Sequence, residues 1–200
     1  MTTRIPDLED TAGRIAARVL VQPPTLGSGR LVCIDGPAGS GKTTLAAALR
    51  RRLLMVSGPA GAGRVEVVHM DDVYDGWAGL ASGIDTVAHS VVAPLRSGAP
   101  GRYRRYDWHR GGFAEERLIE PCAVLLVEGV GSAASAYADA ITCLVWVEAP
   151  SDVRLSRGLA RDGADLWEHW VAWRDQEEAM FARERTRERA DMVVDGLGRG

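Results

Sequence analysis

Eight consecutive residues, followed by Thr44, could hold a polyphosphate: Gly36, Pro37, Ala38, Gly39, Ser40, Gly41, Lys42 and Thr43. They match the pattern G-x-x-x-x-G-K-[ST], in which glycines let successive backbone N–H groups turn inward onto phosphate oxygens. Lys42 would reach the β and γ phosphates, and the Thr43 hydroxyl would bind Mg²⁺. Lys42 is the only lysine among 24 basic residues, which indicates a need for a compact charge that a planar guanidinium cannot supply. Residues 36–44 are therefore expected to bind ATP.

Acidic residues follow two apolar runs elsewhere in the chain. Asp71 and Asp72 come directly after a run that ends at Met70, and Glu128 is the last residue of another run. A carboxylate beside the phosphates could take the proton of an attacking hydroxyl group. Glu128 could supply a direct or water-mediated ligand to the metal of the γ-phosphate. The alternative is that these acids only form turns.

Three arginines recur along one expected helix. Arg154, Arg157 and Arg161 are spaced i, i+3 and i+7, so one helix face would present three guanidinium groups to a transferring phosphoryl group. The alternative is a solvated face whose arginines pair with Asp152 or Asp162.

Residues 98–121 break the regular pattern with glycine, proline, arginine and aromatic residues, which predicts an excursion from the sheet that includes a short hairpin. Aromatic faces suit a planar base, a carboxylate suits a ribose diol, and arginines suit a phosphate or carboxylate on the acceptor. If one or two of these arginines face the site, a neutral acceptor is indicated; if three do, a phosphorylated or acidic acceptor is indicated. The alternative is that the segment is a basic surface hairpin unrelated to the substrate. The candidate acceptor-binding residues are Asp71, Asp72, Tyr74, Trp77, Arg105, Tyr106, Asp107, His109 and Arg110.

Short aliphatic runs alternate with amphipathic segments, which predicts βαβ units on a parallel sheet. Strands are expected at 31–35, 65–70, 123–128, 142–148 and 192–194, and helices at about 7–20, 42–55, 85–97, 151–161 and 165–189. Asp85 would be the N-cap of the third helix, and residues 58–63 would form a plain connector. The predicted fold class is α/β: one domain over residues 1–200 with a three-layer P-loop NTPase fold, a five-stranded mainly parallel sheet and helices on both faces.

The composition excludes several classes of function. With 24 Lys+Arg, 27 Asp+Glu and a formal net charge of -3, the chain has no overall positive field to hold a nucleic acid or an anionic membrane. No apolar run is long enough to span a bilayer, and Cys33, Cys122 and Cys143 lack the spacing of a metal site. We expect a cytoplasmic protein without a nucleic-acid or membrane partner, and the sequence leaves a homodimer open.

Together these motifs resemble the uridine kinase-like P-loop kinases, a family that includes uridine-cytidine, nicotinamide riboside and pantothenate kinases. The resemblance covers most of residues 30–195. The matching segments are residues 34–44, His69-Met70-Asp71-Asp72-Val73-Tyr74, Val127-Glu128-Gly129 and the arginines at 154–161. The resemblance implies that Asp71 is the catalytic base, that Glu128 helps to hold Mg²⁺, and that residues 154–165 form a lid. This lid is shorter than in uridine kinases, and the acceptor segment is compressed to residues 106–110.

The function expected from the residues and the resemblance is transfer of the γ-phosphoryl group of ATP to a hydroxyl of a nucleoside-like or other small metabolite. Its expected catalytic residues are Lys42, Asp71, Arg154, Arg157 and Arg161. Two alternatives remain at this point. The arginines of residues 102–110 would suit a nucleoside monophosphate kinase, and a phosphate loop also occurs in nucleotide-sensing ATPases that have no small-molecule acceptor.

Overall fold

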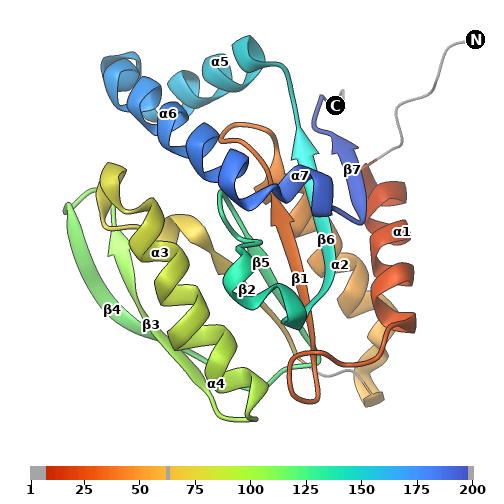
Figure 1. Cartoon of the computed structure of the whole chain (residues 1–200). Helices are drawn as coiled ribbons and strands as arrows, with labels where there is room; N and C mark the ends of the chain where they lie inside the picture. The colour runs from red at the N-terminus through yellow and green to blue at the C-terminus, as the bar shows by residue number, and fades with distance from the viewer. Residues whose placement is uncertain (1–7, 62–63, 198–200) are drawn as a thin grey trace, which may run out of the picture.

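The central sheet is parallel and has five strands in the order β2-β5-β1-β6-β7 (Figure 1). A computed structural model describes residues 8–61 and 64–197 of the chain. The sheet strands are β1 (Arg30–Asp35), β2 (Val65–His69), β5 (Val124–Glu128), β6 (Ile141–Glu148) and β7 (Met192–Asp195). The five predicted strands are therefore confirmed, with small differences at their ends.

Helices cover both faces of this sheet. They are α1 (Leu8–Val21), α2 (Lys42–Gly61), α3 (Leu80–Thr86), α4 (Ala93–Arg96), α5 (Ser151–Asp162), α6 (Trp167–Glu184) and α7 (Thr186–Arg189). Val32 and Ile34 of β1 pack with α1 and α2, whereas Leu31 and Cys33 pack on the opposite side with α3 and α6. Because successive side chains of a strand point to opposite faces, the apolar strands support two cores and the predicted three-layer α/β fold.

The third predicted helix begins five residues earlier than expected. It starts at Leu80, so Asp85 lies inside α3 and is not an N-cap. Gly79 is the N-cap residue and has no side chain that could accept a capping hydrogen bond, so it is a weaker signal for a helix start than Asn, Asp or Ser. A π-helical segment, Val87–Val92, then connects α3 to α4.

Two other helix boundaries also differ from the prediction. The helix expected at 165–189 is interrupted at Arg185, whose φ of 51° is left-handed, before α7 begins. α2 continues to Gly61 through most of the expected connector, of which residues 62–63 lie outside the described residues. A helix that is anchored in the core by Leu49 and Leu53 can extend over weak helix formers in its last turns.

The predicted hairpin is present within residues 98–121 and consists of β3 (Gly101–Asp107) and β4 (Gly112–Ile119). It lies beside α3 and α4, apart from the parallel sheet (Figure 1). The pairing register shifts between Arg104 and Tyr106. Because of this irregularity Tyr103 and Tyr106 are both buried, although strict alternation along a strand would place them on opposite faces.

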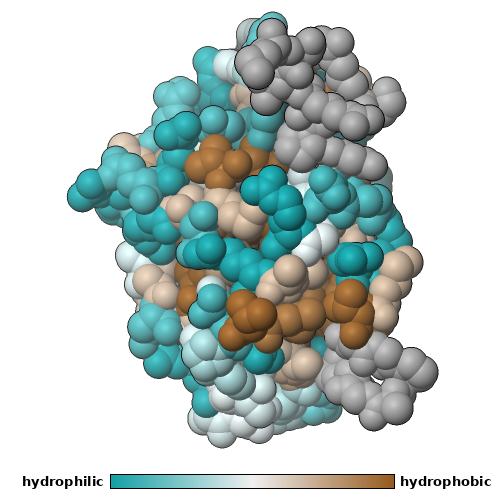
Figure 2. All heavy atoms as spheres, turned by 90° about the vertical axis from the view of Figure 1, so that its right-hand side faces the viewer, coloured by the Kyte–Doolittle hydropathy of each residue, from teal (hydrophilic) through white to brown (hydrophobic). Residues whose placement is uncertain are grey.

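The face of the molecule that carries α1 and β7 exposes several large apolar side chains. Leu20 and Val21 lie at the end of α1, and Val193 lies on β7. In Figure 2 the apolar groups on this face are interspersed with hydrophilic ones. A homodimer stays a prediction.

Within residues 8–61 and 64–197, no helix is both long and apolar enough to cross a membrane.

α5 and α6 pack tightly against each other at the end of the sheet where the strands finish (Figure 1). A Cβ atom at Gly158 would lie 2.3 Å from Cζ2 of Trp170, so only glycine permits this approach. Trp170 also donates its indole N–H to Asp162 Oδ2 at 3.2 Å. The segment predicted as a short lid is thus half of a closely packed helical pair.

We expect Gly158→Ala to destabilise the protein by about 1–3 kcal/mol, because the added methyl group overpacks a buried indole ring. For a chain of this size the melting temperature would fall by several degrees. Gly112→Ala is the matched control, since a Cβ atom there would meet nothing within 4 Å. Thermal unfolding followed by circular dichroism checks the difference, and equal melting temperatures would contradict this account of the packing.

Candidate active site

The phosphate loop joins the end of β1 to the start of α2. Gly36, Gly39 and Gly41 have φ values of 139°, 77° and 103°, a region that favours glycine. The loop also passes very close to other backbone: a Cβ atom would lie 2.1 Å from Val147 O at Gly36 and 2.4 Å from Arg154 O at Gly39. The first backbone N–H groups of α2 have no intrahelical partner, so this end of the helix can receive an anion.

Lys42 is buried and its ammonium group lies under the phosphate loop. Nζ donates to the carbonyl oxygens of Gly36 at 2.8 Å and Pro37 at 3.0 Å. The residue is 7% exposed. The single lysine of the chain therefore occupies a narrow position beside the loop, as the argument for a compact charge requires.

Asp35, which the sequence analysis did not single out, fixes the entrance to the loop. Its buried carboxylate accepts backbone N–H groups from Gly36 (2.7 Å), Gly131 (2.9 Å) and Ala133 (2.9 Å). Burial raises the pKa of Asp35 to about 6, although the three N–H groups and Lys42 oppose this shift. An acid at the end of an otherwise apolar strand was the available signal for it.

Thr43 and Glu128, the two predicted metal ligands, are hydrogen-bonded to each other beside the phosphate loop. Thr43 Oγ1 donates to Glu128 Oε1 at 3.1 Å, and the same oxygen lies 2.6 Å from His69 Nδ1. The hydrogen bond to Glu128 raises the pKa of His69. Both predicted ligands offer the hard oxygen atoms that Mg²⁺ prefers, and together they fit an ion that also binds phosphates and waters. No cluster of three or more acidic, histidine or cysteine side chains suited to a metal occurs among the described residues.

Asp71 lies in the 3₁₀ turn that follows β2, on the same edge of the sheet as the phosphate loop. The residue is exposed, but the surrounding protein limits its solvation, and this raises the pKa of its carboxyl group together with the nearby charge of Glu128. The positive charges of Lys42 and Arg161 act in the opposite direction. The predicted base, metal ligand and phosphate-binding lysine therefore share one electrostatic neighbourhood.

Two of the three predicted lid arginines contact the phosphate loop itself. Arg154 Nη1 donates to Ala38 O at 3.3 Å. Arg157 Nη1 donates to Gly39 O at 3.3 Å and to Gly196 O at 3.0 Å. In this arrangement these guanidinium groups support the phosphate loop from α5.

Arg161 is placed differently. It forms a bidentate pair with Asp162, at 2.7 and 3.0 Å, and its guanidinium lies 5.9 Å from the centre of the Trp170 ring. Asp162 raises the pKa of Arg161, with smaller contributions from the charges of Asp71 and Glu128. The charge of Arg161 lowers the pKa of Asp71, and the charge of Asp71 in turn raises the pKa of Arg161.

Aromatic side chains line the region between the hairpin and α6. The Trp77 ring stacks on His169, with centroids 5.3 Å apart, and meets Trp108 edge-on at 5.5 Å. Trp108 also contacts Tyr106 at 5.2 Å and donates its indole N–H to the backbone oxygen of Asp71 at 2.9 Å. Trp77 was predicted to form part of an acceptor wall, and the structure brings it together with the hairpin and the candidate base.

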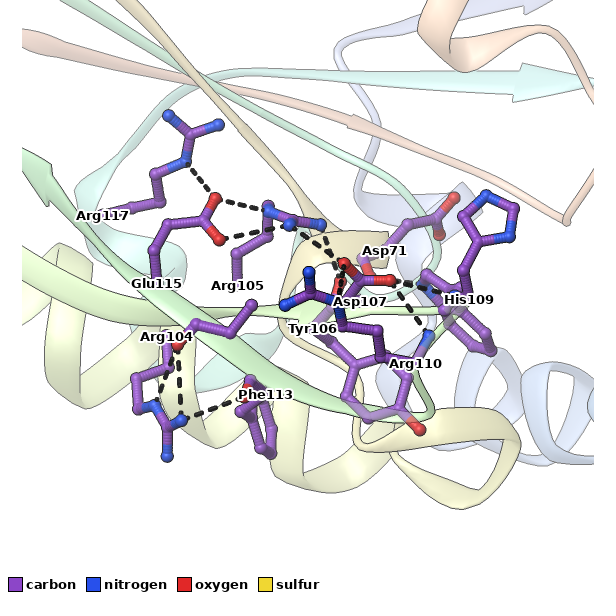
Figure 3. Close-up of polar contacts among 12 residues, drawn as sticks. Asp71, Arg104, Arg105, Tyr106, Asp107, His109, Arg110, Phe113, Glu115 and Arg117 are labelled. Carbon is purple, nitrogen blue, oxygen red and sulfur yellow. Dashed lines mark hydrogen bonds and ion pairs between the residues drawn. The ribbon is translucent and has the colours of Figure 1, made fainter.

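The charged residues of the hairpin mostly pair with one another (Figure 3). Arg105 bonds Glu115 through Nε at 2.6 Å and Nη2 at 3.1 Å, and it reaches Asp107 at 3.4 Å. Asp107 Oδ1 accepts the backbone N–H groups of His109 and Arg110, at 3.0 and 3.1 Å, and so closes the hairpin turn. Both Asp107 and Arg105 therefore have structural partners already.

The remaining acceptor candidates are divided. Tyr74 is buried, and its hydroxyl donates to Val130 O at 2.6 Å, so the structure does not bring it to the site. Asp72 is partly buried, and the pKa of its carboxyl is raised by burial, while the charges of His69 and Arg105 oppose that shift. A hydrogen bond with Tyr103 of β3 also lowers this pKa, which places Asp72 beside the hairpin.

The parallel sheet, the phosphate loop after β1 and the helical pair at the strand ends define a three-layer α/β P-loop NTPase fold. No family model matches the chain, and neither does any curated protein sequence. Solved structures do match. A protein from Bacillus stearothermophilus, described as a "possible uridine kinase", has a TM-score of 0.68 and 20% identity over 94% of this chain and 99% of its own.

A second similar structure is a protein from Silicibacter sp. TM1040, provisionally described as a fructose transport system kinase. Its TM-score is 0.55 and its identity 21%, over 91% of this chain and 98% of the other. Both likenesses extend over more than nine tenths of the chain. At these identities they show the shared fold and leave the activity to be argued from the site.

Proposed function

We propose that this protein is a kinase that transfers the γ-phosphoryl group of ATP, with Mg²⁺, to a hydroxyl group of a small molecule. The observation that carries the proposal is the grouping of acids beside the phosphate loop at one edge of the sheet. Glu128, at the end of β5, accepts from Thr43 of the loop at 3.1 Å, and Asp71 follows the neighbouring strand β2. The charges of Glu128 and Lys42 also act on the pKa of Asp71. A nucleotide-sensing ATPase would need the phosphate loop and the metal ligand. It would leave the acid after β2 and the aromatic wall next to it without a task.

Each group in the proposed mechanism acts on a defined charge or proton. The loop N–H groups and Lys42 bind the polyphosphate, Asp71 orients the acceptor hydroxyl and removes its proton, and Arg161 stabilises the negative charge that develops during transfer. Thr43 and Glu128 would hold Mg²⁺, which supplies charge neutralisation on the phosphates when bound. Arg154 and Arg157 would contribute by holding the phosphate loop in place.

The pairing of the hairpin arginines supports a neutral acceptor. Arg102 bonds Glu116 at 3.2 Å, Arg104 bonds the backbone oxygen of Phe113 at 3.0 Å, and Arg105 is held by Glu115. An acidic acceptor would have to compete with these partners for a guanidinium group. We therefore favour a nucleoside-like or other neutral metabolite over a nucleoside monophosphate.

Trp108→Ala should raise the KM for the acceptor by roughly tenfold and leave the KM for ATP nearly unchanged. Stacking of a planar group on an aromatic side chain contributes about 1–3 kcal/mol, and Trp108 is both exposed and adjacent to Asp71. Trp167→Ala is the control, because this tryptophan is 50% exposed on α6. Steady-state kinetics with each substrate varied in turn measures the split. Equal effects of the two variants on the acceptor KM would remove Trp108 from the acceptor site.

Incubation with MgATP and a pooled panel of nucleosides, nucleoside monophosphates, vitamins and sugar alcohols tests the proposal directly. Mass spectrometry should find one class of neutral compound that has gained a single phosphoryl group. A phosphorylated monophosphate would favour the nucleoside monophosphate kinase, and formation of ADP without any phosphorylated compound would favour the ATPase. Loss of the product with Asp71→Asn excludes a contaminating kinase.

A further inference from the structure

Glu177 is a carboxylate on α6 that is buried to 1% exposure and that the proposed mechanism does not use. Its Oε2 accepts the backbone N–H of Ala38, in the phosphate loop, at 2.8 Å. Its Oε1 accepts from Arg154 Nη1 at 3.0 Å. Both oxygens therefore have a donor, and one of these donors belongs to the loop.

The same pair of side chains holds the other side of Ala38. Arg154 Nη1 also donates to Ala38 O at 3.3 Å, and Arg154 Nε donates to Ala149 O at 3.1 Å. Glu177 and Arg154 thus grip both backbone groups of one residue of the loop. Lys42 bonds the carbonyl oxygens of Gly36 and Pro37. The Pro37–Ala38 peptide is therefore held at its carbonyl oxygen by Lys42 and at its N–H by Glu177.

This arrangement orients the peptide that precedes the phosphate-binding N–H groups. The Ala38 N–H points to α6, and the chain then turns at Gly39, whose φ is 77°, towards the start of α2. A peptide that could rotate at Ala38 would change the direction of the N–H groups that follow it. Backbone N–H groups bind phosphate well only when they already point to the phosphate position before the nucleotide binds.

We infer that Glu177 is a positioning residue that holds the phosphate loop in its nucleotide-binding shape through Ala38 and Arg154. This inference rests on the proposed function. The ion pair between Glu177 and Arg154 would then be present in the free enzyme, before nucleotide binds. This role requires that both carboxylate oxygens of Glu177 accept hydrogen bonds, because each of them faces a donor.

Glu177→Gln is the test, because glutamine preserves the shape but offers one acceptor oxygen and one NH₂ group in place of two acceptors. Either Ala38 or Arg154 would then face a donor. We expect the Kd for MgATP, measured by isothermal titration calorimetry, to rise at least about tenfold. In the kinase assay the KM for ATP should rise with it and the KM for the acceptor should not. Glu178→Gln, at the next and exposed position of α6, is the matched control and should match wild type.

The double variant Arg154→Met/Glu177→Leu separates positioning from stability. Replacing a buried ion pair with apolar residues of similar volume is often neutral or stabilising. We expect this variant to regain the melting temperature of the wild type but to bind MgATP as poorly as Glu177→Gln. Wild-type affinity in Glu177→Gln, or recovery of both affinity and melting temperature in the double variant, would overturn the inference. A wild-type protein that does not bind MgATP would instead contradict the proposed function itself.

Discussion

Asp71→Asn should lower turnover by about 10²- to 10⁴-fold, or about 3–5 kcal/mol of transition-state stabilisation, while the Kd for MgATP stays within a few-fold of wild type. The amide is close in shape to the carboxylate but cannot accept the proton of the acceptor hydroxyl. Single-turnover phosphorylation and calorimetry with MgATP measure the two quantities separately. Asp75→Asn, an exposed position on the same connection, is the matched control.

The pH dependence provides a second measurement on the same residue. A general base works only when it is deprotonated, so the rate falls as the pH falls through its pKa. Because limited solvation and Glu128 raise the pKa of Asp71, the acid limb should lie above the usual range of an aspartate. Asp71→Asn should remove this limb from the kcat profile. An unchanged limb together with full turnover would show that another group accepts the proton.

Lys42→Ala should weaken MgATP binding by about 10- to 100-fold and lower the rate further. The substitution removes a charge-assisted hydrogen bond to the phosphates, and such bonds contribute about 1.5–3 kcal/mol. It also leaves the carbonyl oxygens of Gly36 and Pro37 without their donor. Arg50→Ala removes one exposed positive charge from the same helix and should bind MgATP as wild type does.

Lys42→Arg should fail to restore the activity, although this chain uses arginine at every other basic position. The ammonium group occupies a buried position between two backbone oxygens, 2.8 and 3.0 Å away, and a planar guanidinium is too large for it. Nucleotide affinity and turnover of this variant would be measured beside those of Lys42→Ala. If Lys42→Arg binds MgATP as wild type does, the compact charge is not the reason for the single lysine.

The fold could be predicted because its signals are local. β1 is apolar between its charged ends and is followed at once by the glycines of the phosphate loop, and the later strands have similar apolar runs. The helix that begins at Leu80 was misplaced because glycine is a weaker N-cap signal than aspartate, and Asp85, which carries the stronger signal, lies inside the helix. Capping preferences describe frequent local solutions, and here burial of Leu80 and Ile84 decides the helix boundaries.

The candidate site was only partly predictable, because its contacts join distant parts of the chain. The strand-end positions of Asp71 and Glu128 follow from the topology of a parallel sheet, in which all strands end at one edge. The contact between Glu177 and Ala38 spans 139 positions and has no motif. Likewise, the spacing of Arg154 and Arg161 on one helix could not show that they meet different partners.

Because a protein is synthesised from its N-terminus, the phosphate loop is made well before the residues that contact it from α5, α6 and the segment after β7. The loop itself is made first: Arg157 follows its contact Gly39 by 118 positions, and Glu177 follows its contact Ala38 by 139 positions. A Cβ atom at Gly196 would lie 1.8 Å from Ser40 O, so this late glycine touches the loop directly. The nucleotide binding proposed above would therefore stabilise a nascent chain only once the segment through Gly196 has left the ribosome. A chain truncated before Gly196 would lose this contact with the loop, and we expect it to gain less protection from proteolysis on addition of nucleotide.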